Sequence, residues 1–182
     1  MKSFTRNSLR RLAGETRGAE IAEAAAVLPI MFMMILGIFW FGQAFSIYGT
    51  ITRAAQDGAR AGAAAPNCTT CTSSVNTAAT NASNAVQSAL VAAHLNRPII
   101  PLANWTPPAA VDCLDPGDAV ACTNVGNVCV QTNVQLSNPA SGSVCGISVS
   151  FEYPYQFWLP FTSLNKQSIQ MQAVARVRME TQ

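Results

Sequence analysis

The six cysteines have the plainest chemistry in this 182-residue chain, and all of them follow residue 67. An even number of cysteines in an oxidising compartment typically forms structural disulfides, although spacing alone leaves the connectivity open. We therefore predict structural disulfide bonds among Cys68, Cys71, Cys113, Cys122, Cys129 and Cys145.

Two other kinds of cysteine chemistry have to be weighed against this prediction. Cys68-Thr-Thr-Cys71 has the spacing of a redox motif, which needs a helix N-terminus to stabilise its thiolate. Its threonine-rich surroundings contain no base, and no βαβ pattern precedes it. A zinc site would need a second C-x-x-C or a pair of histidines, and the chain has neither. We expect no metal and no cofactor.

The remaining candidates for catalysis or ligand binding are a short acidic cluster and a single histidine. Asp112, Asp115 and Asp118 lack the Asp-x-Asp-x-Asp-Gly pattern of a calcium loop, so a solvated acidic turn is favoured. His94 lies near the end of a predicted helix, where it caps the helix or faces solvent. Any Ser-His-Asp or Cys-His scheme would depend on it alone, and no phosphate loop or dinucleotide fingerprint is present. We predict a protein that is not an enzyme and takes no small-molecule substrate.

A long uncharged segment follows Glu23. Residues 24–52 contain no charge over 29 positions, whereas a bilayer needs about 20 apolar residues of helix. Residues 1–18 carry five basic side chains against one acidic one, and a basic flank marks the cytoplasmic side. The sequence therefore predicts a helix that crosses a membrane once, with its N-terminal side in the cytoplasm and residues 53–182 outside.

Two other interpretations of this segment fit less well, and the charge of the whole chain excludes a third class of function. A buried core helix is a poor match to 29 uncharged residues beside a basic head. A cleaved secretory signal has a shorter apolar region, and the small residues Ala61-Gly62-Ala63 follow the charged Arg53 and Arg60. A net charge of +2 and a charged fraction of 11% give no case for nucleic-acid binding.

Two features of the predicted helix bear on assembly. A carboxylate at the edge of lipid is costly, so Glu23 needs a specific role, whereas Glu20 is assigned to the headgroup region. Further along, Gly58 and Gly62 form a G-x-x-x-G motif among alanines, and such small faces allow close approach between helices.

These residues resemble the TadE-like minor pilins of the tight-adherence (Flp, type IVb) pilus system. The resemblance rests on a basic leader, Arg17-Gly18, a glutamate five residues after that glycine, and Ala26-Val27-Leu28-Pro29. It continues through Gly37-Ile38, Phe41-Gly42-Gln43-Ala44 and residues 54–60, with a weaker echo at residues 175–180. Relatives usually carry an aromatic residue after the glutamate, where this chain has Ala24.

The resemblance implies cleavage by a prepilin peptidase between Gly18 and Ala19. Glu23 then becomes the fifth residue of the mature chain, where pilins keep an acidic side chain to neutralise the α-amino group of a neighbouring subunit. A charge pair in lipid costs less than two separate charges, which agrees with that role. The implied location is the inner membrane of a bacterium, with residues 53–182 in the periplasm. The implied partners are that membrane, the peptidase, other pilins and the proteins of the pilus assembly platform.

The outer part of the chain has the pattern of a small α+β domain. Residues 73–96 place apolar side chains at three- and four-residue steps, which predicts a helix. Apolar residues alternate in residues 128–136, 147–153 and 169–179, which predicts three antiparallel strands with one face covered by helix. Residues 97–117 contain five prolines and are predicted as loop, as is the apolar segment 154–161.

The predicted organisation has three parts: a basic leader at residues 1–18, a transmembrane and extended helix at 19–64, and a disulfide-bonded outer α+β domain at 65–182. The predicted function is a minor pilin or pseudopilin of a tight-adherence pilus. The alternative is a membrane-anchored periplasmic domain that acts as a sensor or a thiol-redox protein.

Overall fold

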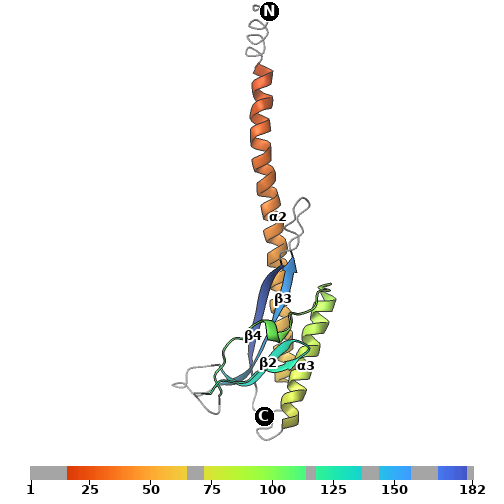
Figure 1. The fold of residues 1–182 in the computed structure, drawn as a ribbon, viewed down its shortest axis with the longest axis vertical. Coiled ribbons are helices and arrows are strands. Elements are labelled where there is room, and N and C mark those ends of the chain that lie inside the picture. The colour runs from red at the N-terminus through yellow and green to blue at the C-terminus, as the bar shows by residue number, and fades with distance from the viewer. Residues whose placement is uncertain (1–15, 65–71, 114–117, 137–143, 157–167, 180–182) are drawn as a thin grey trace, which may run out of the picture. The chain divides into compact units, whose positions relative to one another are not determined.

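The computed structural model describes residues 16–64, 72–113, 118–136, 144–156 and 168–179. The chain divides into two compact units, Met1–Gln43 and Ala44–Gln182. The elements in chain order are α2 (Thr16–Ala63), α3 (Thr72–Ala92), the 3-10 helix η1 (Leu102–Asn104), β1 (Thr123–Val125), β2 (Val128–Gln135), β3 (Cys145–Gln156) and β4 (Ser168–Arg178) (Figure 1).

Helix α2 is continuous over 48 residues, contains Pro29, and contributes to both units. In the first unit its apolar side chains are mostly exposed, as in Ile21 (72% exposed) and Met33 (75% exposed). Among the described residues it is the one helix long and apolar enough, by length and composition, to cross a membrane. An apolar helix surface of this kind fits a lipid environment better than water.

Helix α3 confirms the helical periodicity predicted for residues 73–96, although it ends four residues earlier, at Ala92. Its buried face carries Ala79, Ala82, Val86 and Leu90. After the helix, His94 adopts a left-handed conformation with φ of 57°, and the Leu95 N–H donates to the Leu90 carbonyl at 2.9 Å. This arrangement ends a helix by satisfying its last carbonyls, so His94 has the predicted place at a helix C-terminus.

The four strands form one antiparallel sheet in the order β1-β2-β3-β4. The α+β fold is therefore confirmed, and the three predicted strands correspond to β2, β3 and β4. The prediction of about three strands was one too few, because β1 has only three residues and too little sequence to show an alternating pattern.

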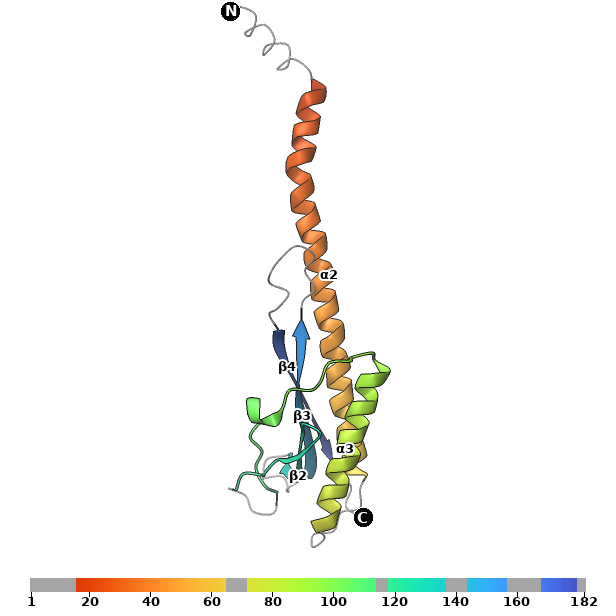
Figure 2. The same ribbon diagram turned by 45° about the vertical axis from the view of Figure 1, so that its right-hand side comes forward.

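The hydrophobic core lies between one face of the sheet and two helices, α3 and the C-terminal part of α2 (Figures 1 and 2). Small side chains from both helices meet larger ones from the sheet. The core residues include Ile51, Ala54, Ala55 and Ala59 of α2, Ala79, Ala82 and Val86 of α3, and Val128, Val130, Ile147, Val149, Phe151 and Tyr153 of the strands. A sheet of this size needs such a cover to be stable in water.

Strand β3 is longer than its alternating pattern predicted. The apolar segment 154–161 was predicted as loop, but Pro154, Tyr155 and Gln156 complete β3, and Tyr155 is buried. All three pair with β4, which supplies the hydrogen-bonding partner that the sequence alone did not reveal. Residues 157–161 lie outside the described part of the chain.

Candidate functional site

The start of α2 holds the residues that the sequence singled out for processing and assembly. Helix α2 begins at Thr16, so the backbone of Gly18 and Ala19 is already helical. Glu20 and Glu23 are both exposed. Their carboxylates are therefore accessible to groups outside this chain, in the unit where the apolar side chains are exposed as well.

Gly58 and Gly62 lie on the face of α2 that packs inside the second unit. A Cβ atom added at Gly58 would lie 2.5 Å from Val86 Cγ2 and 3.0 Å from the Ala82 carbonyl oxygen, both in α3. One added at Gly62 would lie 2.7 Å from Ile147 Cδ1 in β3 and 3.3 Å from the Ala78 carbonyl oxygen. The two glycines thus let α3 and β3 approach the backbone of α2 within the same chain.

The opposite side of this part of α2 carries its charges. Arg53, Asp57 and Arg60 are exposed, whereas Ala54, Ala55 and Ala59 are buried. A helix that carries no charge over residues 24–52 is therefore amphipathic in its last turns, with small residues toward the core and charges toward solvent.

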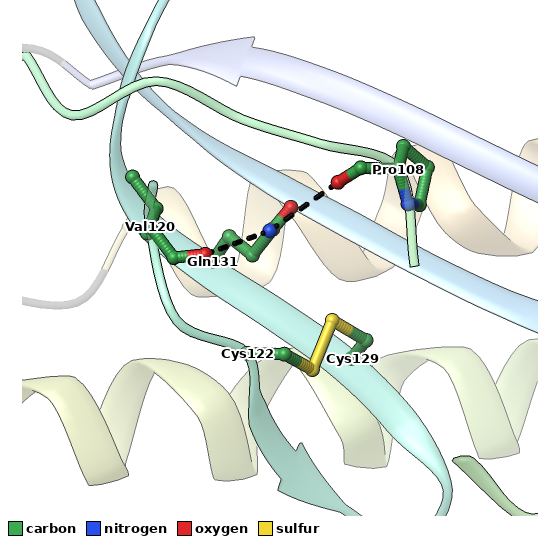
Figure 3. The surroundings of a disulfide bond; sticks show 5 residues. All are labelled: Pro108, Val120, Cys122, Cys129 and Gln131. Carbon is green, nitrogen blue, oxygen red and sulfur yellow. Dashed lines mark hydrogen bonds between the residues drawn. A yellow bond between two sulfur atoms is a disulfide. The ribbon is translucent and has the colours of Figure 1, made fainter. Parts of the chain in front are cut away.

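Four of the six cysteines are joined in two disulfides, Cys113–Cys145 and Cys122–Cys129. Figure 3 shows the second of them. Both hold the segment between η1 and β1 to the sheet, because Cys113 and Cys122 precede β1 whereas Cys129 lies in β2 and Cys145 in β3. Cys68 and Cys71 lie outside the described residues.

Hydrogen bonds tie the same segment across the face of the sheet that the helices leave open. The Gln131 side chain donates to the carbonyl oxygens of Val120 at 3.1 Å and Pro108 at 3.4 Å (Figure 3). The Cys113 N–H donates to the Asn133 carbonyl at 2.8 Å, and Arg176 donates to the Ala109 carbonyl at 3.3 Å. No pattern around Gln131 in the sequence indicates this role, since a single glutamine in a strand has no periodic signal.

Polar side chains also line this face of the sheet, which the segment between η1 and β1 covers. Ser148 and Ser150 of β3 are fully buried, and their hydroxyl oxygens have no partner among the described residues. Burial raises the pKa of the Glu152 carboxyl on the same face, and its Oε2 atom also lacks a described partner. Unpaired buried groups of this kind are usually satisfied by ordered water.

The predicted acidic turn is only partly described. The Asp112 N–H donates to the Asp118 carbonyl at 3.0 Å, while Asp115 falls outside the described residues. Within the described residues no three His, Cys, Asp or Glu side chains gather into a potential metal site.

An exposed apolar helix followed by a small disulfide-bonded α+β domain fits a protein anchored in a membrane. The model of the TadE-like protein family matches residues 18–60, which confirms the resemblance over that part of the chain. The match begins at Gly18 and includes Glu23 and Gly58. It indicates a component associated with the tight-adherence pilus system. Comparison with curated proteins and with solved structures found no match.

Proposed function

We propose that this protein is a minor pilin or pseudopilin, a structural component of a tight-adherence pilus and not a catalyst. The observation that carries the proposal is the family match, which starts at Gly18 and runs through the whole apolar part of α2. The leader, residues 1–18, is cut off by a prepilin peptidase between Gly18 and Ala19. The mature helix then leaves the inner membrane to pack among other pilins at the assembly platform.

The exposure of α2 supports this role. In the first unit the helix offers its apolar side chains to lipid before assembly and to neighbouring helices afterwards. Glu23 is exposed among them, so its carboxylate is available to pair with the α-amino group of another subunit. Pairing removes two isolated charges from a low-dielectric environment, which is the physical reason for a carboxylate at this position.

The same proposal places the chain ends on opposite sides of the membrane. The basic residues before Gly18 stay on the cytoplasmic side, and the domain of residues 65–182 lies in the periplasm or on an extracellular fibre. The two disulfides of that domain agree with an oxidising compartment.

Processing is tested by co-expressing the full chain with a prepilin peptidase and measuring the N-terminal sequence and the intact mass. We expect the purified protein to begin at Ala19. Gly18→Val should block the cut, whereas Gly14→Val, a matched glycine change within the leader, should leave it unchanged. Retention of residues 1–18 by the unaltered chain beside an active peptidase would argue for the anchored sensor or redox domain instead.

Assembly is tested by Glu23→Ala. The variant should insert into the membrane normally but enter pili at least about tenfold less, because an unpaired charge in lipid costs on the order of 2.5–3.5 kcal/mol. Glu20→Ala is the matched control and should assemble like the unaltered chain. The measurement compares the amounts in sheared pili and in the membrane fraction, and equal incorporation of the two variants would remove the assembly role of Glu23.

A further inference from the structure

Strand β4 is a long edge strand. It is last in the sheet order and pairs with β3 on one side, and on its other side no strand of the described residues joins it. The opposite edge, β1, has only three residues, whereas β4 has 11. Exposed edges of that length are templates for a further strand, and proteins normally shorten, bulge or cover them.

The hydrogen-bond pattern identifies the backbone groups that face this edge. The Met179 N–H donates to the Cys145 carbonyl at 3.1 Å, and the register of β3 and β4 continues from that pair without a shift. In an antiparallel pair alternate residues face the partner strand, so the odd-numbered residues of β4 bond to β3. The N–H and C=O groups of the even-numbered residues face outward: Ser168, Gln170, Gln172, Val174, Arg176 and Arg178.

The side chains of these same residues are exposed. They lie on the face of the sheet opposite the helices, because the alternating Ala173 and Ala175 are in the core. Strand β4 contains no proline and no acidic residue, and it carries two arginines, Arg176 and Arg178. Near its start Ile169 is 46% exposed on the helix-facing side. Within the described part of the chain, the edge thus combines backbone groups that pair with no strand with a basic side and an apolar side.

The direction of β4 argues against a second copy of this chain as its partner. Gly62 lies against Ile147 and Gly58 against Val149, so β3 runs opposite to the end of α2 and β4 runs along with it. A two-fold, antiparallel pair of β4 strands would point the last turns of the two α2 helices in opposite directions. Such a pair would also leave Arg176 and Arg178 without a carboxylate opposite them, because β4 contains no acidic residue.

We propose that the free edge of β4 binds an extended, acidic segment of a partner protein as an additional strand. The backbone groups of the even-numbered residues would bond to the partner strand, as in other cases of strand addition. Carboxylates on alternate partner residues would face Arg178 and Arg176, whose guanidinium has further N–H donors besides the one that bonds to the Ala109 carbonyl. The intervening apolar residues would lie beside Ile169 and Val177. The partner is therefore a chain in which acidic and apolar residues alternate.

Hydrogen exchange of the full chain in detergent micelles tests this proposal. In the free protein the amides of Gln170, Gln172 and Val174 should exchange roughly tenfold or more faster than those of Ala173 and Ala175. A synthetic peptide of alternating valine and glutamate should slow the first group, and a peptide of alternating valine and lysine should not. Even-numbered amides already protected in dilute free protein, or equal effects of the two peptides, would overturn the proposal.

Matched variants separate backbone pairing from side-chain contacts. Gln172→Pro removes an outward N–H without removing a bond to β3 and should abolish protection by the acidic peptide, whereas Gln172→Ala should retain it. If Gln172→Pro does not fold, Arg178→Glu serves instead and should remove the preference for the glutamate peptide over the lysine peptide, because Arg176 and the new carboxylate then cancel in charge. An unchanged preference would overturn the charge assignment. Protection that rises with protein concentration without peptide would identify a second copy and overturn the assignment to a different protein.

These measurements depend neither on cleavage after Gly18 nor on incorporation into a fibre. Failure of the peptide to bind therefore leaves the proposed function standing. Retention of residues 1–18 beside an active peptidase would overturn the function and leave the open edge of β4 to be tested on its own.

Discussion

At the scale of single residues, the glycines of α2 show that the presence or absence of a Cβ atom determines whether another element can pack closely against the helix. Gly49 and Gly58 belong to the same helix, yet a Cβ atom at Gly49 would meet nothing within 4 Å, whereas one at Gly58 would meet Val86 and Ala82 of α3. Valine has a stiff, branched side chain, and the Ala82 contact is with backbone, so neither neighbour yields easily. Gly58 is therefore required by a close approach and not by an unusual backbone angle.

Gly58→Ala should lower the stability of the outer domain. Alanine favours a helix over glycine by about 1 kcal/mol, but overpacking a close contact costs about 1–3 kcal/mol, so we expect a net loss and a lower Tm. Gly49→Ala is the matched control and should leave the Tm equal or slightly higher. Thermal unfolding of the full chain in detergent, followed by circular dichroism, makes the comparison, and a Gly58→Ala variant as stable as Gly49→Ala would contradict the packing role.

At the scale of elements, the sequence predicts those with long periodic patterns and misses those made by short or distant contacts. The helical spacing of Ala79, Ala82, Val86 and Leu90 correctly predicts α3, and alternation predicts most of β2, β3 and β4. Strand β1 is too short for a pattern of its own. Its one signal is the two-residue turn at Gly126-Asn127, where both residues have positive φ, a turn type typical of hairpins.

The contacts of the candidate site were predictable only in kind. The G-x-x-x-G motif raises the expectation of a close helix contact, but it does not say that the neighbours of Gly58 and Gly62 are α3 and β3 of the same chain. Similarly, the prolines between residues 97 and 117 predict a loop, but not that Gln131 holds it against the sheet. Side-chain contacts between segments far apart in sequence leave no periodic trace.

At the scale of the whole molecule, the low charge of 11% follows from where the parts of the chain lie. Five of the 11 basic residues precede Ala19, and the apolar segment of α2 excludes charge. What remains is an outer domain poor in charge and rich in serine, threonine, asparagine and glutamine, in which ion pairs contribute little. Where ion pairs contribute little, disulfide bonds can hold a long segment to the sheet. This is the structural role of the cysteines in the outer domain.

The state of all six cysteines can be measured on the whole protein. Because each disulfide takes up two hydrogens, we expect full reduction of the native chain to raise its mass by about 6 Da. Cys113–Cys145 and Cys122–Cys129 account for two of the three bonds, and the third requires Cys68 to pair with Cys71.

The double variant Cys68→Ser/Cys71→Ser is the control for that third bond, and its mass should rise by about 4 Da on reduction, as two remaining bonds require. A rise of about 4 Da in the unaltered chain as well, with Cys68 and Cys71 alkylated before reduction, would show a free C-x-x-C pair and favour the redox alternative. Six thiols alkylated in the native protein would contradict both disulfides, Cys113–Cys145 and Cys122–Cys129, and the oxidising compartment with which they agree.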